Sequence, residues 1–259
     1  MDLVQVAQET VEILRRGWYD VPGARVVLTD DIKSCIASSV YYPEGAKLPP
    51  IPDRSSGKLI ITVTDETTSQ ASRRLRKESP CILNFASAKN PGGGFLRGAK
   101  AQEEDLARVS SLYAPLAQHP DYYLINRASA NGPLYTDGLI ISPGVSFFRD
   151  ENLQLVQYPW KVSVVTCPAP NVGESEITAK RTHTILKRRA HAVLTAMASQ
   201  SGTAILGAWG CGVFGNDPEM VAGVFQDHLA GDFALAFNHM IFAIPGSHTA
   251  NHQAFANAF

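Results

Sequence analysis

The sequence predicts an α/β fold in which a largely parallel sheet is covered by helices on both faces. Short β-rich runs alternate with helical patterns after residue 57, and this alternation is typical of parallel sheets. The chain has 259 residues, of which 45% are hydrophobic and 18% are charged. A chain of that length and composition can form the large buried core that a sheet covered on both sides requires.

The expected strands are short apolar runs bounded by turn-forming residues. They are Lys58–Val63, Cys81–Ala86, Gly138–Ser142, Val162–Thr166, Ala204–Ala208 and His239–Ile244. The spacing of apolar residues between these runs predicts four helices. The helices are Thr64–Lys77, Gln102–Leu116, Thr178–Ala198 and a segment that begins at Asp217-Pro218 and ends at Gly231.

The residues before this alternating region have a different pattern. Asp2 to Gly17 predicts an amphipathic helix, which Asp2 caps and Gly17 ends. Tyr41–Gly57 is rich in proline, glycine and serine, so it is the best candidate for a domain boundary. We therefore expect two parts: residues 1–57 as an N-terminal helical extension with a connector, and residues 58–259 as the main α/β domain.

The charge balance argues against a nucleic-acid-binding surface. There are 23 basic and 24 acidic residues, and the net charge is −1. The two dense basic runs, Arg73–Lys77 and Lys187–Arg189, lie on expected helices, where a solvated helix face explains them. We expect no sequence-specific nucleic-acid partner, and we expect backbone amides to bind any phosphorylated ligand.

No segment of the sequence predicts export or membrane insertion. The N-terminus lacks the apolar core of a signal peptide, and no apolar run reaches ~18 residues. Cys81 and Cys167 fall in apolar, strand-like runs, which is typical of buried thiols in a reducing compartment. We expect a soluble protein without a membrane partner, located in the cytoplasm or, in a eukaryote, the nucleus.

Metal and cofactor motifs are weak or absent in the sequence. His183 and His191 lie eight residues apart on an expected helix, with no acidic residue placed as a third ligand. The P-loop pattern GxxxxGK[ST] does not occur. We therefore expect neither a metal site nor a cofactor.

The first of two glycine-rich loops follows the expected strand Cys81–Ala86. Gly92, Gly93 and Gly94 lack Cβ atoms, so their backbone can approach a ligand closely and adopt positive φ. Successive N–H groups can then bind an anion. A flexible turn that only connects two elements is the alternative explanation, and the triplet alone favours neither.

Three polar residues, Gln102, Glu103 and Glu104, stand seven residues after the triplet at the expected start of a helix. Adjacent side chains diverge by ~100° along an established helix, but at a first turn both carboxylates can reach one ligand. The competing explanation is that the acidic residues only stabilise the positive end of the helix dipole. Taken alone, the acidic run favours that second explanation.

The second loop, Gly207–Asn216, leads from an expected strand into the Asp217-capped helix and has four glycines in ten residues. Two glycine-rich loops that each follow a strand of one sheet can hold a ligand with two adjacent phosphates between them. Phe214 is placed to pack on a ribose or a base, whereas Trp209 is better explained as a core residue.

A glycine triplet, a short spacer and then Gln-Glu-Glu resemble the signature of poly(ADP-ribose) glycohydrolases. The pattern N-x-A-S-A-x-N-P-G-G-G, from Asn84 to Gly94, and the run Gly210–Asn216 resemble the bacterial-type (microbial) branch of that family. The resemblance extends from about Leu59 to the C-terminus, and the N-terminal helical segment matches the usual extension of this branch. It implies a three-layer α/β/α macrodomain with a mixed central sheet and an N-terminal helical extension, which binds ADP-ribose at the strand ends.

The resemblance also implies roles for individual residues. Glu104 is the implied catalytic acid, and Glu103 is implied to bind ribose hydroxyls. Gly92–Gly94 are implied to contact the diphosphate and the ribose at the scissile bond, with Asn90 near that ribose. The other implied ligand-binding residues are Gln102, the second phosphate loop with Gly210, Gly212, Val213, Phe214, Gly215 and Asn216, and Thr64, Asp65, Glu66 and Thr67 at the adenine pocket. A helix cap explains Asp65 equally well.

The function implied by the resemblance is hydrolysis of the ribose–ribose O-glycosidic bonds of poly(ADP-ribose), with Glu104 as general acid and base. Poly(ADP-ribose) or ADP-ribosylated proteins would be the substrate, and ADP-ribose the product. Three alternatives stay open: removal of mono-ADP-ribose from modified protein or nucleic acid, non-catalytic binding of ADP-ribose, and an enzyme that uses NAD or a sugar nucleotide. The run Gln102–Glu104 argues against binding alone, which needs no acid there.

Overall fold

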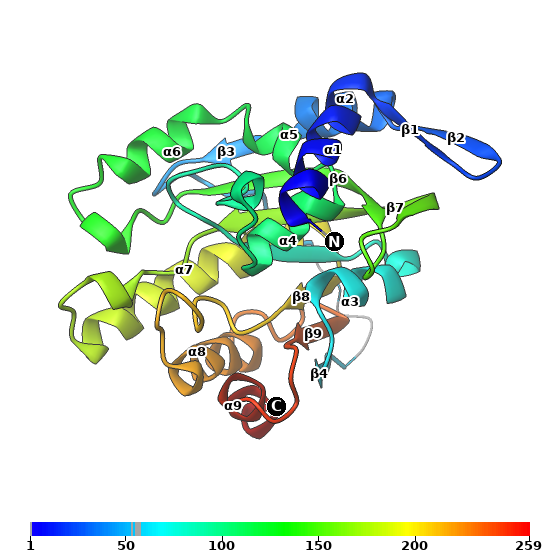
Figure 1. Cartoon of the computed structure of the whole chain (residues 1–259). Helices are drawn as coiled ribbons and strands as arrows, with labels where there is room; N and C mark the ends of the chain where they lie inside the picture. The colour runs from blue at the N-terminus through cyan, green and yellow to red at the C-terminus, as the bar shows by residue number, and fades with distance from the viewer. Residues whose placement is uncertain (1, 53, 55–57) are drawn as a thin grey trace.

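The structure of the protein is a computed structural model, and it describes residues 2–52, 54 and 58–259. A seven-stranded mixed sheet lies between two layers of helices (Figure 1). The α/β class and the mixed central sheet are therefore confirmed. Ser55, Ser56 and Gly57, at the end of the expected connector, lie outside the described residues.

The sheet has the strand order β3-β6-β7-β5-β8-β9-β4. Five neighbouring strands, from β7 to β4, run parallel, while β6 is antiparallel to both β7 and β3. In chain order the strands are β3 (Val40–Tyr42), β4 (Ile60–Thr64), β5 (Cys81–Phe85), β6 (Leu139–Arg149), β7 (Leu155–Cys167), β8 (Thr203–Leu206) and β9 (His239–Ala243). All six predicted strands are present, and β6 and β7 are longer than predicted because they form a hairpin.

The helices cover both faces of the sheet (Figure 1). One face packs against α7 (Ala179–Gln200), α8 (Pro218–Ala230) and α9 (Ala250–Ala258). The other face packs against α2 (Thr29–Ser38), α3 (Thr68–Arg74), α4 (Gln102–Val109), α5 (Tyr113–Leu116) and α6 (Pro120–Arg127). Successive residues of β5 point to opposite faces, so Cys81 and Leu83 join the first cluster and Ile82 the second. Burial on both faces explains the nearly continuous apolar runs in the parallel strands.

The N-terminal segment begins with the predicted helix α1 (Leu3–Arg16). Asp2 accepts a hydrogen bond from the Val4 N–H at 2.9 Å, and Gly17 ends the helix with a φ of 80°. A two-stranded hairpin, β1 (Trp18–Val21) and β2 (Ala24–Val27), follows it. The strand β3 then joins the main sheet, so the segment before residue 57 is not only helical. The division into two parts at residue 57 stays a prediction.

Two predicted helices differ in extent from the observed ones. The expected helix Gln102–Leu116 is interrupted at Ser110, which forms a β-bridge with Phe147 instead of continuing the helix. The Ser111 N–H likewise donates to the Ser146 carbonyl at 2.8 Å. The expected helix from Thr64 begins only at Thr68, where a capping box fixes its start.

Two kinds of feature are absent from the described ranges. No helix there is both long and apolar enough to span a bilayer. No group of three or more His, Cys, Asp or Glu side chains in those ranges is arranged to hold a metal ion.

Candidate active site

The first glycine-rich loop joins β5 to α4 and contains the short 3-10 helix η2 (Phe95–Arg97). Gly92 and Gly93 have φ values of 66° and 58°, a conformation that favours glycine. The Gly93 N–H donates to the Asn90 carbonyl at 3.0 Å, and a Cβ on Gly92 would lie 2.9 Å from the buried Phe95 ring. The triplet is therefore a tight and defined turn.

Glu103 is almost fully buried, with 2% of its surface exposed. Its carboxylate accepts hydrogen bonds from the Ser87 N–H at 2.6 Å and from the Asn84 side-chain amide at 3.2 Å. Burial raises the pKa of Glu103 to about 8, because desolvation disfavours the charged form by more than these hydrogen bonds stabilise it. Glu103 is therefore mostly protonated at neutral pH.

Glu104 lies beside it, with 9% of its surface exposed. Its Oε1 accepts a hydrogen bond from the Gly94 N–H at 2.8 Å. Its Oε2 is also buried, and no group among the described residues forms a hydrogen bond with it. A buried carboxylate oxygen without a partner is costly, so this atom is placed to meet a group that the surrounding residues do not supply.

Both carboxyl groups approach the same glycine. A Cβ on Gly93 would lie 2.9 Å from Glu104 Cδ and 3.2 Å from Glu103 Oε2. The two side chains leave adjacent positions in the first turn of α4, where neighbouring residues can converge. Stabilisation of the helix dipole alone does not explain why both are buried at one point.

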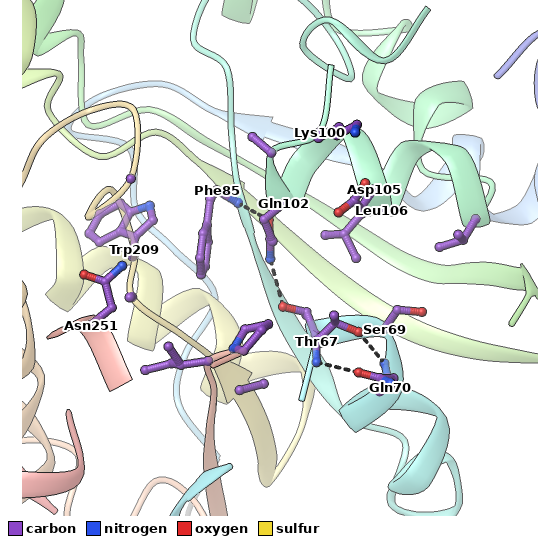
Figure 2. A pocket seen from close by; sticks show the side chains of 18 of the residues that line it. Thr67, Ser69, Gln70, Phe85, Lys100, Gln102, Asp105, Leu106, Trp209 and Asn251 are labelled. Carbon is purple, nitrogen blue, oxygen red and sulfur yellow. Dashed lines mark hydrogen bonds between the residues drawn. The ribbon is translucent and has the colours of Figure 1, made fainter. Parts of the chain in front are cut away.

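Gln102 connects three elements at the start of α4 (Figure 2). Its Oε1 accepts a hydrogen bond from the Phe85 N–H at 2.8 Å at the end of β5. Its Nε2 donates to the Leu83 carbonyl at 2.8 Å and to Thr68 Oγ1 at 3.1 Å, at the start of α3. Gln102 thus fixes where α4 begins and, with it, the orientation of the two glutamates that follow.

The second glycine-rich loop joins β8 to α8 and has the spacing G-x-G-x-x-G from Gly210 to Gly215. Loops with this spacing between a strand and a helix bind phosphates through backbone N–H groups. A Cβ on Gly210 would lie 2.6 Å from Asn216 Nδ2, which donates to the carbonyls of Pro170 at 2.8 Å and Gly210 at 3.0 Å. Asn216 therefore braces the loop from inside, while Val213 at its tip is 85% exposed.

The two aromatic residues of this loop have different surroundings. Trp209 is fully buried and its indole N–H donates to the Cys167 carbonyl at 3.1 Å, so its prediction as a core residue is confirmed. Phe214 is half-buried, and its ring centroid lies 5.9 Å from that of Tyr135. Both aromatic residues also line the cavity between the two loops.

A cavity of about 740 Å³ lies at the carboxyl ends of the parallel strands (Figure 2). This volume is within the usual range for sites that bind small molecules. Its walls come from the start of α3, the loop after β5, the second glycine-rich loop and the segment after β9. The predicted site residues that line it are Gln102, Gly210, Gly212, Val213 and Phe214.

Other predicted site residues do not line the cavity. Glu103 and Glu104 directly follow Gln102, which lines the cavity, and the glycine triplet contacts their carboxyl groups. Asn90 is exposed, and its side-chain oxygen accepts a hydrogen bond from Arg127 at 3.0 Å.

Thr64 and Asp65 do not line the cavity. Asp65 accepts hydrogen bonds from the N–H groups of Gly246 at 2.6 Å and Ser247 at 3.1 Å, and these hold its pKa below the usual range. Asp65 thus connects the end of β4 to the loop before α9. Of the four residues expected at the adenine pocket, Thr67 lines the cavity, as part of the wall Thr67–Gln70, and Glu66 does not. A role for the four residues in ligand binding stays a prediction.

Sequence reasoning missed part of the cavity wall. The missed residues include Phe85, Lys100 and Asp105 on the first loop side, and Pro245 and Asn251 after β9. The signal for the last two was present in the sequence. Because β9 runs parallel to β8 and β4, its exit lies at the same edge of the sheet as theirs.

The family model described as the microbial-type PARG catalytic domain matches residues 7–150. This span includes the glycine triplet, Gln102 and both glutamates. The chain belongs to the microbial-type poly(ADP-ribose) glycohydrolase (PARG) family. A search of curated proteins found no match.

Solved PARG structures resemble the chain over nearly its whole length. The PARG of Thermomonospora curvata is 41% identical, with a TM-score of 0.92 and 99% of each chain covered. The same PARG bound to the inhibitor ADP-HPD is 40% identical, with a TM-score of 0.90 and the same coverage. The PARG of Deinococcus radiodurans in complex with ADP-ribose is 39% identical, with a TM-score of 0.79, and covers 93% of this chain and 98% of its own.

Proposed function

We propose that this PARG hydrolyses the ribose–ribose O-glycosidic bonds of poly(ADP-ribose) and releases ADP-ribose, with Glu104 as general acid and base. The observation that carries the proposal is the state of the Glu104 carboxyl group. One of its oxygens is fixed by the Gly94 N–H, and the other is buried without a partner among the described residues. A fixed carboxyl group with one oxygen left for substrate is the arrangement that leaving-group protonation needs.

The diphosphate of the substrate would lie between the two glycine-rich loops. Backbone N–H groups of Gly212, Val213 and Phe214 would replace its hydration at one side. The triplet would contact it at the other side through a backbone without Cβ atoms, because the N–H groups of Gly93 and Gly94 already pair with Asn90 and Glu104. This mode of binding agrees with a net charge of −1, because it needs no broad positive surface. Holding the diphosphate places the neighbouring ribose against the carboxyl pair, so positioning contributes to the rate together with proton transfer.

The chemistry follows from the two carboxyl groups. Glu104 donates its proton to the oxygen of the scissile bond while the bond between that oxygen and the ribose C1 breaks through an oxocarbenium-like state. Water then attacks the ribose C1 and returns a proton to the Glu104 carboxylate. Atoms therefore balance without a cofactor: the polymer loses one terminal unit, one water is consumed, and ADP-ribose is formed.

Glu103 supports this reaction by keeping a proton next to Glu104. Burial raises its pKa to about 8, so Glu103 itself holds a proton beside Glu104 at neutral pH. A protonated Glu103 is also a hydrogen-bond donor, and it would bind a ribose hydroxyl in the cleft. We assign it to substrate binding beside the acid.

Digestion of defined substrates tests the proposal. The purified chain is incubated with poly(ADP-ribose) and, separately, with protein that carries single ADP-ribose units, and free ADP-ribose is measured over time. We expect rapid release from the polymer and at most slow release from the singly modified protein. Release from the modified protein alone would make the chain a mono-ADP-ribosyl hydrolase. Binding of ADP-ribose without any product over hours would make it a binding domain.

A cytoplasmic location is also part of this proposal and rests on the sequence alone.

A further inference from the structure

Tyr135 has a backbone conformation that side chains rarely adopt. Its φ is 59° and its ψ is −168°, in a region populated almost only by glycine. The residue follows the short helix η3 (Gly132–Leu134) and is 4% exposed. Such strain persists only where the surroundings hold it, and strained residues gather at functional sites.

Hydrogen bonds on both sides hold Tyr135 in this conformation. The buried Arg189 donates from Nη2 to the Leu134 carbonyl at 2.9 Å, immediately before it. The Thr136 N–H donates to Asn126 Oδ1 at 2.9 Å, immediately after it. Asn126 is itself buried in α6, so the segment is anchored to two helices, α6 and α7.

The Tyr135 ring contacts Phe214 of the second glycine-rich loop. The two ring centroids are 5.9 Å apart, with the rings inclined at 45°. This distance is within the range of favourable aromatic pairs. Phe214 lines the cavity, whereas its neighbour Val213 is 85% exposed and Gly212 has open space where a Cβ would be. The contact therefore supports a loop in which the residues just before Phe214 are open to solvent.

The backbone of Phe214 is held by the same part of the molecule. Its carbonyl accepts hydrogen bonds from the N–H groups of Val172 at 2.9 Å and Gly173 at 3.2 Å, in the short helix η4 (Val172–Glu174). The Asn171 N–H donates to the Pro133 carbonyl at 3.0 Å, which joins η4 to the segment before Tyr135. Both the ring and the carbonyl of Phe214 thus depend on one anchored unit.

We propose that Tyr135 is a positioning residue that fixes Phe214, and with it the second glycine-rich loop, in the conformation that binds ADP-ribose. The proposal rests on the proposed function, in which this loop binds the diphosphate. A loop that is already ordered before binding loses less conformational entropy when ADP-ribose binds, so the affinity for ADP-ribose is higher. The strained backbone of Tyr135 is what directs the ring toward Phe214.

Substitutions that separate the ring from the backbone test this role. Tyr135→Gly removes the ring and relieves the strain. Tyr135→Asn removes the ring but keeps the strain, because asparagine tolerates positive φ mainly in the left-handed helical region and not at a ψ of −168°. Tyr135→Phe keeps the ring and removes only the hydroxyl. We expect Tyr135→Gly and Tyr135→Asn to weaken ADP-ribose binding about tenfold and to raise the KM for polymer by a similar factor, with kcat changed less. Tyr135→Phe should stay within about twofold of wild type in each quantity.

A double-variant cycle separates a positioning role from a general loss of structure. If Tyr135 acts through Phe214, adding Tyr135→Gly to Phe214→Ala should change the Kd for ADP-ribose by less than about twofold. Wild-type affinity in Tyr135→Gly, or effects of the two substitutions that multiply, would overturn the proposal. Because the readout is ADP-ribose binding, it decides the role of Tyr135 even if wild type fails to cleave the polymer, which would contradict only the proposed function.

Discussion

The carboxyl group of Glu104 occupies the space beside Gly93 that a side chain at Gly93 would need. A Cβ built there would lie 2.9 Å from Glu104 Cδ, and the φ of Gly93 is 58°. The glycine triplet and the Gln-Glu-Glu run therefore pack directly against each other. The residues between them reverse the direction of the chain, so the glycine triplet lies against the first helical turn of α4.

Gly93→Ala is therefore expected to reduce kcat about 100-fold, because the added Cβ displaces the carboxyl group that must meet the scissile bond. The matched control is Gly23→Ala, which has a φ of 78° but open space around the added Cβ in the β1–β2 turn. Both substitutions place an alanine at positive φ and therefore lower the free energy of unfolding, but only Gly93→Ala should lose activity. Equal kcat values in the two variants would contradict the close contact.

The raised pKa of Glu103 predicts how stability depends on pH. The group has a folded pKa of about 8 and an unfolded pKa near 4.5, so its contribution is fully present below pH 4.5 and is lost as the pH rises through 8. Relative to Glu103→Gln, the free energy of unfolding of wild type should fall by on the order of a few kcal/mol between pH 5 and pH 8. Urea unfolding of both proteins across this range measures the difference, which would be independent of pH if Glu103 titrated normally.

Gln102→Ala tests whether the start of α4 is set by that side chain. The substitution removes the partners of the Phe85 N–H and the Leu83 carbonyl, so we expect a loss of about 1–3 kcal/mol in stability. We also expect kcat/KM to fall about tenfold, because the two glutamates that follow lose their orientation. Gln5→Ala, at an exposed position of α1, should leave both quantities unchanged. An active Gln102→Ala enzyme would show that α4 is positioned by other contacts.

Arg188 and Arg189 offer a matched pair for the network around Asp137. Arg189 is fully buried and donates to Asp137, Pro168 and Leu134, each at 2.9 Å, whereas Arg188 pairs with Asp137 from the surface. Arg189→Met should lower the free energy of unfolding by about 3–5 kcal/mol, because it leaves buried acceptors unpaired. Arg188→Met should cost about 1 kcal/mol or less. Urea unfolding measures both variants. Similar decreases in their free energies of unfolding would contradict the difference in burial.

The sequence predicted the parallel core of the fold because its strands and helices have strong local signals. The apolar run at β5 and the Asp217-Pro218 cap of α8 depend on neighbouring residues alone. The β1–β2 hairpin and β3 were missed, because they are very short and their pairing is decided by contacts distant in sequence. The interruption at Ser110 was missed for the same reason, since its backbone pairs with Phe147 in β6.

Part of the site was equally open to prediction. The triplet, Gln102 and the two glutamates form a local motif, and the structure brings them together. The sequence does not predict that Glu103 is buried, because residues distant in the sequence form its surroundings. Among them are Asn84 and Ser87, which donate hydrogen bonds to its carboxyl group. Tyr135 gave no signal either, since its unusual φ arises from anchoring by Arg189 and Asn126.

The assignment of Glu104 as the acid is tested most directly by Glu104→Gln, which keeps the shape of the side chain and removes its proton chemistry. Time-resolved digestion of poly(ADP-ribose) by wild type and variant is measured together with calorimetric binding of ADP-ribose. We expect the variant to bind ADP-ribose within about tenfold of wild type and to lose at least about 100-fold in kcat. Unchanged cleavage by a variant that still binds ADP-ribose would contradict the assignment.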